Sequence, residues 1–178
     1  MMMNETETFG LLKDYCLFRL NNSPVAEAKK INFPSSTPSD VSQKMRFLAH
    51  KWAGELKSWP QLTNGKDFSI FSYNEFQLSM QQGFENLKDV TSMVIYAYFE
   101  FVSVCAIFSI STNINGPNLN DICQYAAHYL HSSEKFLSFL FHHHGWASFL
   151  TKEYQKAKLE QSSLFNHWLA VLNEGFLV

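Results

Sequence analysis

The sequence predicts an all-α protein, and three observations support this prediction. Apolar residues recur at three- and four-residue spacing in one segment after another, which places them on one face of a helix. Glycine and proline are scarce, at 7 and 5 residues out of 178, and no strand-turn-strand rhythm recurs. Residues 93–110 are apolar almost all the way round, with a single charge at Glu100, so this helix needs neighbours on every side.

Composition and charge set limits on the class of protein. The length of 178 residues suits one domain with a substantial core, and we expect residues 1–178 to form it. Hydrophobic residues make up 46% and charged residues 17%, which excludes a disordered chain. The net charge of -2 gives no electrostatic basis for binding nucleic acid. Three cysteines without metal-ligand spacing favour a reduced, cytoplasmic setting, and the N-terminus does not look like a secretory signal.

The expected helices follow one another along the chain, separated by polar or turn-forming residues. They cover residues 7–21, 41–59, 74–88, 93–110, 121–131 and 134–141, followed by a short helix from 146 and a last helix from 162. Residues 22–38 are rich in Ser and Pro and predict a mobile loop, whereas residues 155–161 predict a polar link. Residues 68–73 are aromatic and predict a short, irregular element. About eight helices are therefore expected.

Helix starts and stops support these boundaries. Ser39 or Asp40 can cap the helix over residues 41–59. Asn118 or Asn120 can cap the helix that follows the central one. An Asn-Gly-Pro break separates these two helices, so we expect them to form a central antiparallel hairpin.

A distinctive motif lies in residues 138–154, which read SFLFHHHGWASFLTKEY. Phe139 begins an aromatic–aliphatic pair, and Phe149 begins a second one. A run of three histidines and then Gly145-Trp146 separate the two pairs. Aromatic helices are common, so this motif is informative only together with the others in the chain.

Three further stretches accompany this motif. Residues 95–101 read IYAYFEF, residues 11–20 read LLKDYCLFRL, and residues 165–168 read FNHW. With residues 138–154, they resemble the homology motifs of the Bcl-2 family of apoptosis regulators, in the order of that family and over nearly the whole chain. Residues 138–154 resemble its second motif, and 95–101 the apolar part of its first. Residues 11–20 resemble its fourth motif, and 165–168 the segment before its membrane tail.

The resemblance implies a Bcl-2-like helical bundle with a hydrophobic surface groove. Such a groove binds the amphipathic BH-3 helices of pro-death Bcl-2 relatives, either Bak/Bax-like proteins or BH-3-only proteins. The expected groove residues, with the first three on one wall, are Leu48, Trp52, Leu56, Phe84, Leu87, Val90, Met93, Val94, Ala97 and Phe101. No cofactor, metal ion or nucleic acid is expected.

The chain departs from the family pattern at the groove. In the family, the first motif contains a Gly that admits the partner helix and an Arg that pairs with its Asp. Met93 and Val94 occupy these two positions here. His144 replaces the first glycine of the second motif. Alternatives for the missing cation are Lys88, Lys51 and Arg46.

The resemblance favours an anti-apoptotic protein, because the N-terminal helix resembles the fourth motif. The alternative is a Bax/Bak-like effector that permeabilises the mitochondrial outer membrane. The central helix has the length of a membrane span, but Glu100 would cost about 2–3 kcal/mol or more at its centre. The apolar end, residues 168–178, is too short to span, so the chain either lacks a tail anchor or was cut before one. Membrane association therefore stays open.

A remote alternative from another class is a metal-dependent enzyme that uses the histidines. His128 and His131 are three residues apart and can share a helix face, and His142, His143 and His144 follow. Neither carboxylates nor cysteines complete a recognisable ligand set. The sequence also contains no Gly-rich phosphate loop, nucleophile elbow or paired acidic motif. We therefore expect a protein that is not an enzyme.

Overall fold

The computed structural model describes residues 4–22, 39–53, 73–112 and 118–176, and these residues form helices without any strand. The seven helices are α1 (Glu5–Asn21), α3 (Asp40–Ala53), α5 (Tyr73–Phe84), α6 (Ser92–Thr112), α7 (Leu119–Ser132), α8 (Glu134–His142) and α9 (Trp146–Phe176). The all-α prediction is confirmed. The expected loop at 22–38 lies almost entirely outside the described residues, as do Leu56 and residues 68–72.

Polar side chains begin three of the helices. The Asn4 side chain accepts a hydrogen bond from the Thr6 backbone N–H at the start of α1. Ser39 accepts from the Ser42 N–H before α3, and Asn118 accepts from the Asp121 N–H before α7. Each cap satisfies one of the N–H groups that lack a partner in a first helical turn. Of the cap residues that the sequence offered, Ser39 and Asn118 form these bonds.

The apolar helix α6 lies at the centre of the bundle. It packs against α1, α3 and α7, which supply the neighbours that an all-round apolar helix requires. Its middle section, including Tyr98, Phe99 and Val102, is fully buried. Its first turn is less covered, since Ser92, Met93 and Val94 are half-buried. The first turn and the middle of the same helix therefore have different surroundings.

Glu100, the one charge in α6, is paired with α1. Its carboxylate accepts hydrogen bonds from the Tyr15 hydroxyl and from Arg19 Nη2, the latter at 2.6 Å. Glu100 is only 2% exposed, and burial followed by the nearby Glu100 charge raises the pKa of Tyr15. A buried carboxylate is tolerated only when it is paired in this way. The network fixes the register between α1 and α6.

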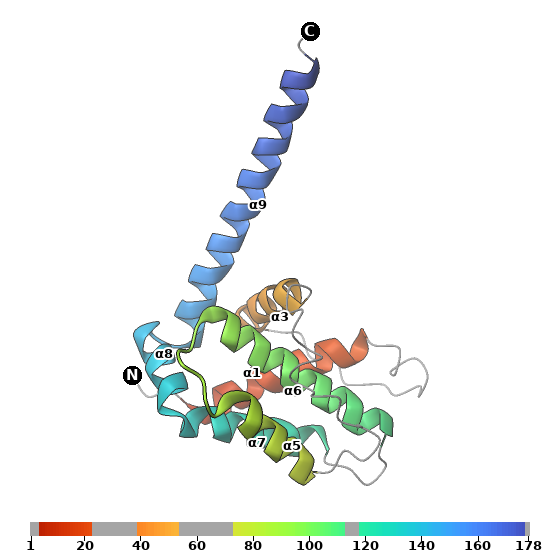
Figure 1. Ribbon diagram of the computed structural model, residues 1–178, viewed down its shortest axis with the longest axis vertical. Coiled ribbons are helices and arrows are strands. Elements are labelled where there is room, and N and C mark those ends of the chain that lie inside the picture. Colours follow the sequence, from red (N-terminus) through yellow and green to blue (C-terminus); the bar gives the residue numbers. More distant parts are fainter. Residues whose placement is uncertain (1–3, 23–38, 54–72, 113–117, 177–178) are drawn as a thin grey trace.

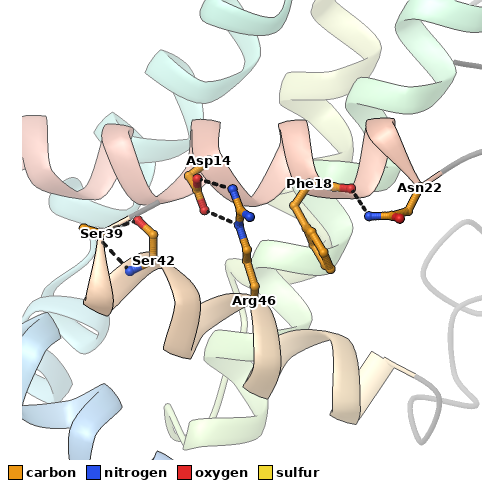
Figure 2. Close-up of polar contacts among 6 residues, drawn as sticks. All are labelled: Asp14, Phe18, Asn22, Ser39, Ser42 and Arg46. Atoms are coloured by element: carbon orange, nitrogen blue, oxygen red, sulfur yellow. Dashed lines mark hydrogen bonds and ion pairs between the residues drawn. The ribbon is translucent and has the colours of Figure 1, made fainter. Parts of the chain in front are cut away.

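A second ion pair connects α1 to α3 (Figure 2). Arg46 Nε and Nη2 donate to the two Asp14 carboxylate oxygens at 2.9 and 2.6 Å. The Arg46 guanidinium also lies 5.2 Å from the centre of the Phe18 ring. This two-point geometry holds the side chain in one orientation.

The turn between α8 and α9 uses two residues in the left-handed region of φ. The N–H groups of His144 and Gly145 donate back to the carbonyls of Phe141 and Leu140, which closes the end of α8. His144 has φ 60° and Gly145 has φ 92°. Glycine adopts such angles without a steric penalty, whereas histidine has a Cβ that opposes them.

The turn delivers Trp146 to a buried junction of three helices. Trp146 Nε1 donates to the Thr8 hydroxyl at 2.8 Å, and this hydroxyl lies 2.7 Å from His131 Nε2. Because the indole can only donate, the Thr8 proton is free to be donated to His131 Nε2 in the neutral tautomer that leaves this nitrogen unprotonated. Burial lowers the pKa of His131, which agrees with that neutral form. The contacts connect α1, α7 and α9.

Helix α9 differs from the prediction. We expected a short helix from residue 146, a polar link at 155–161 and a last helix from 162, but Trp146–Phe176 is one continuous helix. The predicted link reads QKAKLEQ, which is polar but consists of strong helix-forming residues without Gly or Pro. Figure 1 shows α9 extending well beyond the rest of the bundle. Polarity marks an exposed stretch of this helix and does not break it.

Candidate functional site

An open pocket of about 410 Å³ lies between α3, the first turns of α6 and the first half of α9. Its apolar surface comes from all three helices, and charged side chains of α9 form part of its wall. The lining residues are Leu48, Trp52, Ser92, Met93, Tyr96, Glu153, Lys156, Ala157 and Glu160.

Helical spacing accounts for the apolar part of the pocket. Leu48 and Trp52 are four residues apart on α3, and Met93 and Tyr96 are three apart on α6, so each pair shares one helix face. Leu48 and Tyr96 are almost fully buried, whereas Trp52 and Met93 are half-buried. The pocket thus has a buried base and partly exposed apolar walls.

The polar groups of the residues that line the pocket differ in whether they have a hydrogen-bond partner. The Ser92 hydroxyl donates to the Glu153 carboxylate, which joins α6 to α9. The Tyr96 hydroxyl is buried and has no hydrogen-bond partner among the described residues. Burial, followed by the nearby Glu153 charge, raises the pKa of Tyr96. Lys156 and Glu160 are exposed at the rim.

Three of the ten predicted groove residues line this pocket, namely Leu48, Trp52 and Met93. Phe84 and Phe101 are instead buried in an aromatic cluster, with Phe84 4.9 Å from Tyr98 and 5.8 Å from Phe101 between ring centres. These side chains pack inward because the cluster removes their large apolar surface from water. They belong to the core.

The other predicted groove residues lie elsewhere. Leu87, Val90 and Val94 are half-buried against the core, and Ala97 is half-buried on α6. Val90 lines a separate pocket between the segment that precedes α6 and helix α8. None of these four lines the α3–α6–α9 pocket, and Leu56 lies outside the described residues.

The sequence interpretation did not anticipate the contribution of α9. Glu153, Lys156, Ala157 and Glu160 line the pocket, yet most of them fall within or beside the expected polar link. Lys156, Ala157 and Glu160 follow Glu153 by three, four and seven residues. This spacing places all four on one face of a continuous helix, so the sequence does contain a pattern that could have predicted their shared position. Tyr96 lies three residues after Met93, so the same helical spacing could have predicted that it lines the pocket.

The three candidate cations also have different surroundings. Arg46 is engaged by Asp14 on α1. Lys88 lines the separate pocket beside α8. The Lys51 ammonium lies 5.1 Å from the centre of the Trp52 ring, at the edge of the α3–α6–α9 pocket. Lys156 lines that pocket directly and was not among the candidates.

The histidines are held by different contacts rather than gathered at one centre. His131 bonds to Thr8, His128 Nδ1 lies 3.4 Å from Glu5 Oε1, and His143 packs on Phe139 at 4.3 Å. The described residues contain no group of three or more His, Cys, Asp or Glu side chains that could hold a metal ion. No geometry supports the metal-enzyme alternative among these residues.

The three cysteines are free and buried. The sulfurs of Cys16 and Cys123 lie 3.9 Å apart, across α1 and α7. Their mutual hydrogen bond and burial raise the pKa of Cys16. Thiols that are buried are shielded from reaction partners, so these side chains act as packing residues.

Comparison of the chain with models of known families, with curated proteins and with solved structures finds no match. The Bcl-2 resemblance therefore rests on the four motifs in the sequence.

Proposed function

We propose that this protein is a Bcl-2-like regulator of apoptosis, of the anti-apoptotic type, that binds BH-3 helices of pro-death relatives. The observation that carries the proposal is the open pocket with apolar walls from three helices, including Leu48, Trp52 and Met93. A pocket of this kind accepts an apolar side chain from an amphipathic helix. The protein would act in the cytoplasm and at the mitochondrial outer membrane.

The energetic requirement for such binding is modest. Each apolar anchor of a bound helix contributes about 1.5–3 kcal/mol when it is buried. Four anchors exceed the lower part of the association cost, which is about 4–15 kcal/mol. Affinity of about 1 μM is therefore attainable without a central ion pair, when burial is near the top of its range and the association cost near the bottom. Partners that lack the usual acidic residue can bind as well.

Titration with a panel of BH-3 peptides tests the proposal, with fluorescence anisotropy as the readout. The panel includes one peptide whose conserved acidic residue is changed to Ala. We expect binding of at least one peptide, and an absence of binding at about tens of micromolar (about −6 kcal/mol) would refute the proposal. The Ala peptide should keep its affinity, because Val94 stands where the family has the Arg that pairs with the acidic residue of the peptide.

Two tryptophans provide a matched pair of variants for this titration. Trp52→Ala removes an apolar wall of the pocket and is expected to weaken binding about 30-fold, which corresponds to about 2 kcal/mol. Trp168→Ala removes the same side chain from the distal part of α9, where it is 63% exposed. The second variant is expected to bind like the parent protein. Equal effects of both variants would place the binding site outside the pocket.

A Bax/Bak-like effector is the second candidate, and one observation favours it. Within α6, Ser92–Ile110 has 19 residues with a mean hydropathy of 1.9, which is long and apolar enough to cross a membrane. Most of this span is buried in the bundle, at 61%, as expected for a core helix. Dye release from liposomes, with and without an activator peptide, separates the candidates. Release in either case would overturn the anti-apoptotic proposal.

A further inference from the structure

Tyr96 lines the pocket, and its hydroxyl oxygen is buried without a hydrogen-bond partner among the described residues. Tyr96 as a whole is 1% exposed. Tyr98, two residues further on, donates its hydroxyl to the Ala126 carbonyl. Buried polar groups are usually satisfied, so a bound molecule that brings an acceptor would complete the Tyr96 site once the ring shifts toward the pocket.

Charged residues on α9 form a row along the pocket that Tyr96 lines. Glu153, Lys156 and Glu160 are three and four residues apart and line the same pocket. Glu153 already accepts from Ser92. Neither Lys156 nor Glu160 forms an ion pair with any described residue, and they are separated by about 6 Å along the helix axis. Two opposite charges one turn apart thus remain available at the rim.

We propose that the pocket recognises an amphipathic helix that carries an acidic and a basic side chain one turn apart at the edge of its apolar face. The acid pairs with Lys156, the base pairs with Glu160, and the helix supplies a hydrogen-bond acceptor to Tyr96. This recognition of the partner's charges by α9 specifies the ligand of the proposed function more closely, and it rests on that function. Apolar walls with charges of both signs match such a helix better than a uniformly charged partner.

Synthetic amphipathic helical peptides of about twenty residues test the charge recognition. All carry leucines at three- and four-residue spacing and differ only in two edge positions one turn apart, which hold Glu and Lys, Lys and Glu, or two Ala residues. The Ala peptide should bind with lower affinity than the better of the two charged peptides. The difference should be about three- to tenfold and should shrink at high salt.

Exchanging the two charges on the protein, rather than on the peptide, tests the same ion pairs. The double variant Lys156→Glu/Glu160→Lys should reverse the preference between the two charged peptides and leave the Ala peptide unaffected. Lys152→Glu, on α9 but outside the pocket lining, is the matched control and should leave the preference unchanged. An unchanged preference in the double variant would overturn the charge recognition, even where the peptides bind.

Tyr96→Phe separates a binding role from a structural one. The hydroxyl has no described partner to lose, so the variant should unfold at the same or a higher denaturant concentration. It should nevertheless bind the preferred peptide about fivefold more weakly. Parental affinity in this variant would overturn the role of the hydroxyl, and lower stability would show that it has a structural partner.

These outcomes are distinguishable from failure of the proposed function. If none of the BH-3 or synthetic peptides binds the parent protein, both proposals fall. If peptides bind without regard to Lys156, Glu160 and Tyr96, only the recognition proposal falls. Sedimentation velocity, with and without peptide, provides the last check. A dimer that dissociates on peptide addition would identify a second copy of the chain as the occupant and overturn the recognition proposal.

Discussion

The middle and the beginning of α6 are built from similar residues, but the buried hydroxyls of Tyr98 and Tyr96 differ in whether they have a hydrogen-bond partner. In the middle, Glu100 is paired with Tyr15 and Arg19, and the Tyr98 hydroxyl bonds to a carbonyl of α7. At the beginning, the Tyr96 hydroxyl is buried without a described partner beside an open pocket. Satisfied polar groups stabilise a unique packing, whereas an unsatisfied one next to a pocket lowers stability and favours a ligand.

The largest effect on stability is expected when the ion pair between Arg19 and Glu100 is broken. Arg19→Leu leaves the buried Glu100 carboxylate without its cation and should lower the free energy of unfolding by about 3 kcal/mol. Urea denaturation followed by circular dichroism measures this loss. Arg19→Leu/Glu100→Leu is the control and should recover much of it, because an apolar pair leaves no buried charge. A single variant as stable as the parent would show that the pair does not secure the middle of α6.

A direct comparison of the two regions comes from Tyr98→Phe and Tyr96→Phe. The change at Tyr98 deletes a hydrogen bond to Ala126 O and should cost about 1 kcal/mol. The same change at Tyr96 deletes a hydroxyl without a described partner and should cost nothing or increase stability. Matched urea titrations measure both. Equal losses of stability in the two variants would contradict the difference between the middle and the beginning of α6.

The junction of Thr8, His131 and Trp146 predicts a smaller, pH-dependent effect. Burial lowers the pKa of His131 in the folded protein, although Glu5 opposes this and His128 adds to it. The unfolded state therefore binds the proton first, so stability is present above about pH 6.5 and is lost as the pH falls toward the folded pKa. Urea midpoints from pH 7.5 to 5, on the order of half-unit steps, measure this loss.

His131→Gln is the control for the pH series. Glutamine keeps an acceptor for Thr8 but does not titrate, so the variant should show a shallower loss of stability below about pH 6.5. The difference between the two curves isolates the histidine from the carboxylates that titrate at lower pH. Parallel curves would contradict a neutral His131 at this junction.

The smallest effect on folding is expected at the rim of the pocket. Lys156→Ala and Glu160→Ala remove exposed side chains without described ion pairs and should change stability by less than about 0.5 kcal/mol. Thermal unfolding of the two variants checks this. A large loss would mean that the rim charges support the fold of α9, and the pocket would then resemble the closed middle of α6.

Local patterns in the sequence were sufficient to predict most of the helices. The caps at Ser39 and Asn118, the all-round apolar character of α6 and the helical spacing of α7 act within a few residues, so they can be recognised without tertiary contacts. The prediction ended α5 near residue 88, whereas the helix ends at Phe84. The break within α9 was wrong, because polarity was given more weight than helix propensity.

The sequence by itself determined the all-α class and the central place of α6, and the groove that the family resemblance implies includes three residues that line the pocket, Leu48, Trp52 and Met93. Only the tertiary structure decided that Glu100 is neutralised by α1 and that Phe84 and Phe101 turn into the core. It alone brought Lys156 and Glu160 of α9 to the pocket. The physical reason is that periodicity shows which face of a helix is apolar, but the partner of that face depends on segments as far apart as Arg19 and Glu100.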